Sequence, residues 1–258
     1  MTALLLAAIS HFIGDRFIFV TAALLAVPAF IALSLIQPDE IDFDRARGDG
    51  AAPEGVESKS KSWVELFRSD RVLLVFLCAA TLFHLANAAM LPQLGELLSR
   101  GQPTLAAPFM SACIIVTQVV ITLSAAWVGK ASGSYGRRPL LLVAFGVLPV
   151  RAVLYTLTHS PALLIAIQVL DGVANSIFGV VSILVIADRL RHTGRFNLGQ
   201  GALGTMVGLG AAFSATLGGL VIQRLGFNAS FLVLGGVAVF AFALLFYGVP
   251  ETRNVASD

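Results

Sequence analysis

The stretch "PALLIAIQVLDGVANSIFGVVSILVIA", residues 161–187, decides the fold class of this chain. Its 27 residues carry one charged side chain, Asp171. As an α-helix the stretch would be about 40 Å long, which is enough to cross a hydrocarbon core of ~30 Å. A carboxylate at the centre of such a helix costs about 2.5–3.5 kcal/mol unless something compensates it. The stretch therefore predicts a membrane-spanning helix, and Asp171 needs an interaction partner.

The rest of the chain is similarly apolar. Of its 258 residues, 57% are hydrophobic and only 12% are charged, and the mean hydropathy is +0.86. This leaves too little polar surface to cover a water-soluble globule. An apolar stub at 1–13 is too short to cross a membrane. We expect an all-α polytopic membrane protein with seven full spans, at 17–36, 72–93, 106–128, 139–158, 161–187, 201–222 and 229–249.

The distribution of basic residues predicts the orientation. When the loops are assigned alternately to two sides, Arg16, Arg100 and Arg224 fall on one side, and Arg151 lies within a span. The positive-inside rule makes the richer side cytoplasmic. We therefore expect a cell (inner) membrane protein with its long linker and C-terminus in the cytoplasm. The richer side holds Arg45, Arg47, Lys59, Lys61, Arg68, Arg71, Lys130, Arg137, Arg138, Arg189, Arg191, Arg195 and Arg253.

A polar segment and an internal repeat predict the domain organisation. Residues 37–71 carry mixed charges and glycine-rich stretches, as a flexible cytoplasmic linker does. Residues 14–38 and 226–250 share eight identities in 25 at a fixed offset, and both end in a proline that an acidic residue follows. This alignment would start the chain in the middle of a helix. We expect 1–36 to be the remnant of an N-terminal six-helix half, 37–71 the linker, and 72–258 the C-terminal six-helix half.

The sequence gives no support for catalysis or for a bound cofactor. It contains no HExxH, GxSxG, Walker or CxxC motif. Cys78 and Cys113 both fall within predicted spans, where they are expected to be small packing residues rather than a disulfide or a metal pair. We expect no enzyme activity, no cofactor, no metal and no nucleic-acid partner, with the lipid bilayer as the surroundings of the chain.

The segment "GKASGSYGRRPLLL", residues 129–142, resembles the loop signature of the major facilitator superfamily, G-x-x-x-D-x-x-G-R-R/K. Gly129, Gly136, Arg137 and Arg138 occupy the matching positions, and Gly133 stands where that family has an aspartate. The ending "VPETR", residues 249–253, is similar to the close of that family's last helix.

The resemblance implies a major-facilitator-like helical bundle and a secondary active transporter. Such carriers work by alternating access between two halves, here on a small organic solute, with drug/proton antiport as one form. The loop would gate transport by sliding against the other half. From the residues alone, glycines permit a tight turn in a ten-residue connection, and the two arginines fix topology or bond carbonyls at helix C-termini. Both interpretations of the loop stay open.

Asp171 and Arg151 are the deepest charged residues of the predicted spans. Counted from the turn at His159, their depths differ by about 6 Å, which is within the reach of an arginine. We expect the two side chains to pair or to share a polar cavity. The alternatives are a purely structural ion pair, or an arginine that extends alone toward the membrane surface.

Polar side chains also form stripes on three spans, at helical spacing. Such stripes predict helices that line a shared aqueous cavity, and hydrogen bonding within a packed bundle is the alternative. The stripes are His84 and Asn87; Ser111, Gln118 and Thr122; and Gln168, Asp171 and Asn175. His84 and Asp171 are the candidate proton-binding groups. On the span 201–222, "GTMVG" at 204–208 predicts a face for close helix packing.

Two further interpretations of the function remain open at this point. The chain could be a non-transporting membrane subunit, or an inactive truncated carrier. A working carrier is expected to need a missing N-terminal half as its partner.

Overall fold

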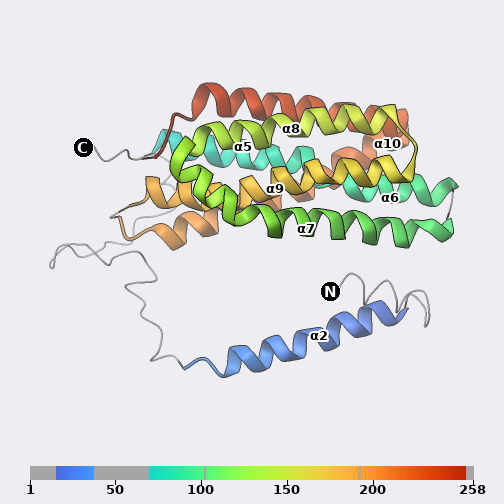
Figure 1. The fold of residues 1–258 in the computed structure, drawn as a ribbon, viewed down its shortest axis with the longest axis horizontal. Coiled ribbons are helices and arrows are strands. Elements are labelled where there is room, and N and C mark those ends of the chain that lie inside the picture. The colour runs from blue at the N-terminus through green and yellow to red at the C-terminus, as the bar shows by residue number, and fades with distance from the viewer. Residues whose placement is uncertain (1–15, 38–69, 102, 192, 254–258) are drawn as a thin grey trace.

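The computed structural model describes residues 16–37, 70–101, 103–191 and 193–253, and within these ranges it contains helices and no strand. The all-α prediction is therefore confirmed. The predicted stub at 1–13 and most of the predicted linker lie outside the described residues. The helices are α2 (Arg16–Ser34), α5 (Arg71–Asn87), α6 (Met90–Gly101), α7 (Pro103–Tyr135), α8 (Arg137–Leu157), α9 (Pro161–Arg189) and α10 (Phe196–Gly248) (Figure 1).

The described part of the chain holds five helical runs that are long and apolar enough to cross a membrane, with α5 and α6 counted as one. The last run, α10, contains 53 residues, but Gly226 interrupts it with a φ of +85°. The Ser230 hydroxyl donates to the Gly218 carbonyl, so the chain folds back on itself at this glycine. Residues 71–248 therefore make six crossings, which coincide with the last six predicted spans, and α2 covers the predicted span 17–36 as far as Ser34.

The connection between α7 and α8 differs from the expected ten-residue loop. α7 continues to Tyr135 and α8 begins at Arg137, so that Gly136 alone joins them, with a φ of +95°. Glycine adopts this conformation without the steric cost that a side chain would bring. Gly129 and Gly133 lie inside α7, and a Cβ on either would meet nothing within 4 Å. The expected length of ten residues was wrong because Gly129 and Gly133 are helical, whereas the expected tight turn at a glycine is found at Gly136.

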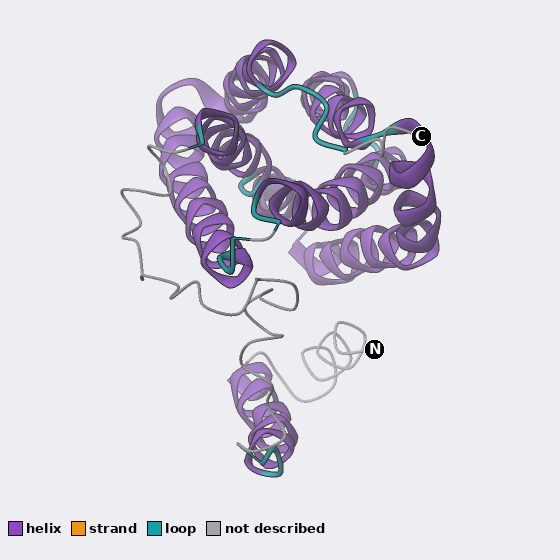
Figure 2. Ribbon diagram, turned by 90° about the vertical axis from the view of Figure 1, so that its left-hand side faces the viewer, coloured by secondary structure: helices purple, strands orange, loops and turns teal. Residues whose placement is uncertain are grey.

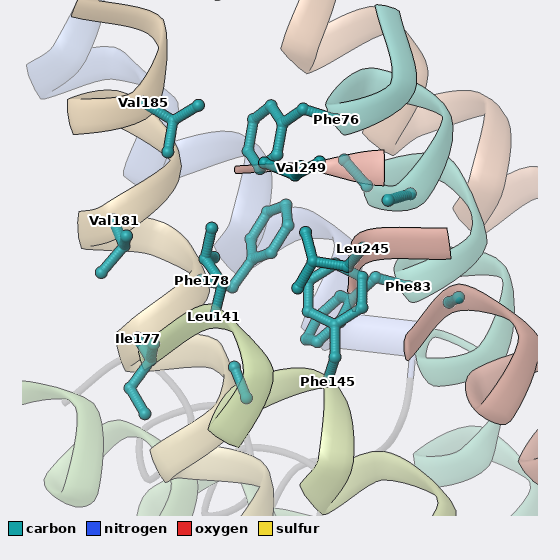
Figure 3. Packing of buried hydrophobic residues seen from close by; sticks show 14 of the residues in the cluster. Phe76, Phe83, Leu141, Phe145, Ile177, Phe178, Val181, Val185, Leu245 and Val249 are labelled. Atoms are coloured by element: carbon teal, nitrogen blue, oxygen red, sulfur yellow. The ribbon is translucent and has the colours of Figure 1, made fainter. Parts of the chain in front are cut away.

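The main hydrophobic core lies mostly between α5, α8, α9 and the C-terminal part of α10, with a few residues from α7 and from the start of α10 (Figure 3). Phe83 of α5 stacks on Phe178 of α9 with ring centroids 4.7 Å apart, and Phe145 of α8 lies 4.8 Å from the ring of Phe83. α2 contributes no residue to this core. Figure 2 shows the helices of the bundle end-on, packed around one another. The four core helices therefore hold their polar residues at fixed relative positions.

The glycine-rich start of α10 packs closely against α5 and α6, but not through the predicted face at 204–208. A Cβ on Gly204 or Gly208 would meet nothing within 4 Å. At Gly210, by contrast, a Cβ would lie 2.2 Å from the Thr81 carbonyl oxygen of α5. The prediction named the wrong part of the helix, because glycine spacing alone does not show which face meets a neighbour.

Candidate functional site

Arg151 of α8 and Asp171 of α9 form an ion pair inside the bundle. The guanidinium Nη1 donates to the Asp171 Oδ1. Arg151 is 1% exposed and Asp171 is 8% exposed. The expectation that the two side chains meet, drawn from their equal depth, agrees with this geometry.

Two asparagines extend the ion pair, one on α9 and one on a third helix, α5. Arg151 Nη2 donates to the Oδ1 of Asn87, the last residue of α5. Asn175 Nδ2 donates to Asp171 Oδ1 at 2.9 Å, and Asn87 Nδ2 lies 3.5 Å from Asn175 Oδ1. We call these four side chains the polar ring: Asn87, Arg151, Asp171 and Asn175. Because each charge has a neutral hydrogen-bond partner as well as its counter-ion, the ring offsets part of the cost of burial.

A fourth helix reaches the ring through Thr117, which the sequence prediction missed. The Thr117 hydroxyl of α7 donates to Asp171 Oδ2 at 3.3 Å. Close approach of α7 to α9 is possible here because residue 172 is glycine. A Cβ on Gly172 would lie 2.6 Å from Val120 Cβ. The small residues Cys113, Thr117 and Ser124 recur along α7 at helical spacing, and this was the sequence signal for the contact face.

The predicted polar stripe of α7 lies on another face of that helix. Gln118 and Thr122 are exposed, and the Thr122 hydroxyl donates to the Gln118 carbonyl of its own helix at 2.8 Å. Ser111 is half-buried. The stripe therefore does not join the polar ring, and Ser124, which donates to the Ser176 hydroxyl at 2.8 Å, links α7 to α9 instead.

His84 and Gln168 lie outside the ring. The His84 ring packs edge-on against Phe178, with centroids 4.9 Å apart, and its Nε2 has no hydrogen-bond partner among the described residues. Gln168 is fully buried one turn before Asp171, beside Cys113 and Tyr155. The two predicted proton-binding groups, His84 and Asp171, therefore sit in different surroundings, one aromatic and one charged.

The two arginines of the glycine-arginine motif bind partners at one end of the bundle. Arg137 Nε donates to Asp188 Oδ2 at the end of α9, at 2.8 Å. Arg138 Nη2 donates to the Phe246 carbonyl in the last turn of α10, at 2.7 Å. Arg137 Nη1 also donates to the Ser132 carbonyl in the last turn of α7, at 2.9 Å, so the expectation that the arginines bond carbonyls at helix C-termini is confirmed for both. Asp188 supplies a carboxylate for the motif, although Gly133 stands at the family's aspartate position.

Glu251, in the segment after α10, caps the start of α8. Its carboxylate accepts the backbone N–H groups of Arg137 at 2.9 Å and Arg138 at 3.1 Å. Free N–H groups at a helix N-terminus favour a negative charge. Partial burial would raise the pKa of the Glu251 carboxyl, but the backbone N–H groups hold that pKa below its ordinary value. The "PETR" ending thus binds the glycine-arginine motif at the start of α8, a contact that the sequence analysis did not predict.

The C-terminal part of the chain matches a known family. Residues 118–258, more than half of the chain, match the Major Facilitator Superfamily. The chain therefore belongs to the major facilitator superfamily, a family of transporters, and it is a multi-pass membrane protein.

Its relatives are named as transporters. Two proteins called uncharacterized MFS-type transporters, from two strains of Mycobacterium tuberculosis, are each 38% identical to it over 245 residues. The match covers 95% of this chain and 58% of each relative. The chain thus spans a little over half the length of these relatives.

Proposed function

We propose that this chain is part of a secondary active carrier that moves a small organic solute by alternating access, in the form of drug/proton antiport. Membership of the major facilitator superfamily supports the class of protein. The lipid bilayer would be the cell (inner) membrane, with the Arg137 and Arg138 end of the bundle toward the cytoplasm. A second six-helix bundle would supply the other wall of the transport pathway.

The observation that carries the proposal is the buried Arg151–Asp171 pair within helices long enough to cross a membrane. An ion pair of this kind gives little net stability compared with packed apolar residues. Ionisable residues inside membrane spans mark proton or substrate pathways by default. A functional role therefore explains the pair better than a stabilising role.

The polar ring gives the pair a way to act on several helices. If Asp171 takes up a proton, Arg151 loses its counter-ion, and the hydrogen bonds to Asn87, Asn175 and Thr117 must rearrange. These residues lie on α5, α9 and α7, and Arg151 lies on α8. A single protonation can thus bias the packing of four helices, which is what coupling a proton to alternating access requires.

The test is export of ethidium from cells that lack their own multidrug exporters and express the native gene. Proton movement is followed in inverted vesicles with a pH-sensitive dye. The wild-type protein should lower ethidium accumulation and release protons when ethidium is added. Asp171→Asn should accumulate ethidium as cells without the protein do. Glu96→Gln, which removes a carboxylate that pairs with Arg100 on the surface of α6, is the control and should transport normally.

Each outcome decides between the alternatives. Transport by Asp171→Asn at the wild-type rate and pH dependence would overturn the role of the pair. If the wild-type protein exports neither ethidium nor any member of a panel of cationic dyes and fluoroquinolones, drug/proton antiport is the wrong form. A cellular function that survives Asp171→Asn combined with Arg151→Gln would favour a non-transporting subunit.

A further inference from the structure

The span formed by α5 and α6 is interrupted at Ala88 and Ala89, near the middle of its length. The sequence cause is Pro92. Proline has no N–H to donate to the carbonyl four residues earlier, and its ring crowds that carbonyl, which here belongs to Ala88. Kinks of transmembrane helices at proline persist where other groups satisfy the freed backbone atoms. The interruption therefore needs a partner from another helix.

Ser214 of α10 is that partner. Its hydroxyl oxygen accepts the Ala89 N–H at 2.9 Å, in a buried position, across 125 residues of sequence. In a continuous helix this N–H would donate to the Leu85 carbonyl. Ser214 is fully buried, so water does not compete for the bond.

α10 approaches the span closely on both sides of the interruption. On the α5 side, a Cβ on Gly210 would lie 2.2 Å from the Thr81 carbonyl oxygen. On the α6 side, a Cβ on Gly218 would lie 2.0 Å from the Gln93 Nε2. Gly210, Ser214 and Gly218 are four residues apart and so lie on one face of α10. This face supports both segments, and Ser214 is its central contact.

Arg151 of the polar ring contacts the same interruption. Asn87, which accepts from Arg151, is the last residue of α5. Met90, whose sulfur lies 3.2 Å from Arg151 Nη2, is the first residue of α6. Arg151 thus contacts the residue on each side of Ala88 and Ala89. The interruption is therefore in contact with both the Ser214 hydroxyl and the Arg151 guanidinium.

We propose that Ser214 is a positioning residue for the Arg151–Asp171 pair, and that it fixes the α5–α6 interruption as a hinge which the pair opens when Asp171 loses its charge. This inference rests on the proposed function. With Asp171 neutral, Arg151 no longer holds Asn87 and Met90 in place, so the hinge opens and the Ala89–Ser214 bond breaks with it. The segment α6 then turns relative to α5.

The contact of α6 with α7 allows such a turn. Gly95 of α6 faces Met110 of α7, and a Cβ on Gly95 would lie 2.5 Å from the Met110 sulfur. Methionine is unbranched and flexible, so it can follow a moving neighbour. The outer end of α6 carries Arg100, whose guanidinium lies 4.9 Å from the ring of Phe227. A turn of α6 would change this contact at the outer end of the bundle.

Hydrogen exchange followed by mass spectrometry tests the hinge directly, on the purified full chain in lipid nanodiscs and without substrate. The peptides of interest cover residues 85–93. Ser214→Ala should speed exchange of the Ala89 amide about five- to tenfold, the factor for one lost hydrogen bond of ordinary strength. Asp171→Asn should speed the same amide. Thr216→Val is the matched control, because its hydroxyl is exposed and faces the Ala212 carbonyl of its own helix.

The double variant separates a hinge from general loosening. If Ser214 and the pair hold one hinge, Ser214→Ala with Asp171→Asn exchanges no faster than the faster single variant. Multiplied effects, or faster exchange along all of α5 and α10, would mean a merely structural role and would overturn the proposal. Wild-type exchange of Ala89 in Asp171→Asn would overturn it as well.

Two features keep the test decisive. Where Asp171→Asn does not fold, Asp171→Asn with Arg151→Gln releases Asn87 and Met90 equally and takes its place. Because exchange is measured without transport, a carrier that fails the ethidium test can still show the hinge, and an active carrier can still lack it.

Discussion

Gly136 leaves the space that the Glu251 carboxylate fills. A Cβ at position 136 would lie 2.3 Å from Glu251 Oε2 and 2.8 Å from its Cδ. The φ of +95° at Gly136 also aims the first N–H groups of α8 at this carboxylate. Glycine thus has two roles here: it allows the turn between α7 and α8, and it admits the cap from the end of the chain.

Replacing Gly136 by alanine should therefore destabilise the protein by at least about 1–2 kcal/mol, through both the positive φ and the displaced carboxylate. Gly129→Ala is the matched control. Gly129 is helical and a Cβ there would meet nothing within 4 Å, so alanine should be neutral or stabilise by about 0.5–1 kcal/mol. Thermal unfolding in detergent measures both variants, and equal effects of the two would contradict this account.

The Glu251 cap should make stability depend on pH in the acid range. Because the pKa of Glu251 is lower in the folded protein than its ordinary value of 4.5, the cap stabilises fully above that pH. The contribution is lost as pH falls from there through the folded-state pKa. We expect the unfolding temperature of the wild-type protein to drop more steeply below about pH 4.5 than that of Glu251→Gln. Parallel curves for the two proteins would exclude this cap as the cause.

Breaking the buried pair should cost far more than breaking an exposed one. Asp171→Asn leaves the Arg151 guanidinium buried without a counter-ion, and such changes destabilise by about 3–5 kcal/mol. Adding Arg151→Gln removes the uncompensated charge and should recover most of the folding yield. Glu96→Gln breaks the Arg100–Glu96 pair, whose side chains are 63% and 50% exposed, and should cost less than about 1 kcal/mol. The measurement is the folding yield and unfolding temperature of the wild-type protein, the two single variants and the double variant. Equal losses for Asp171→Asn and Glu96→Gln would contradict this account.

Two threonines on α7 differ in what they contact. Thr117 donates to Asp171 Oδ2, whereas Thr122 donates to a carbonyl of its own helix. Thr117→Val should destabilise by about 1–2 kcal/mol, because it leaves a carboxylate oxygen with one donor fewer. It should also lower ethidium export, while Thr122→Val leaves both quantities near wild type. Similar losses in the two variants would show that α7 does not act through the ring.

Much of the fold followed from the apolar pattern. Six crossings and the pairing of Arg151 with Asp171 could be predicted because span length and depth depend only on position along the chain. The orientation of α7 could not, because its polar residues lie on more than one face and only the neighbour at Gly172 selects Thr117 over Gln118. The position of a residue in depth is readable from the sequence, whereas its rotation about the helix axis depends on packing.

The long-range contacts could not be predicted from the sequence for a similar reason. The bonds between Ser214 and Ala89, and between Glu251 and the start of α8, join residues more than 100 positions apart. Nothing local distinguishes Ser214 from other serines of the spans. The sequence prediction of one span at 72–93 missed the interruption at Ala88 and Ala89, for which Pro92 was the available signal, but a proline shows where a helix bends and not which side chain satisfies the bend.

The one-residue connection at Gly136 leaves α7 and α8 almost no slack. A single residue spans at most about 3.6 Å of chain, so neither helix can slide along the other by more than that distance. A larger displacement of α7 along its axis must therefore move α8 with it, so that the two helices move as one rigid body. Thr117 lies on α7 and Arg151 lies on α8, and both contact Asp171. Thr117 and Arg151 would therefore move toward the Asp171 carboxylate, or away from it, at the same time.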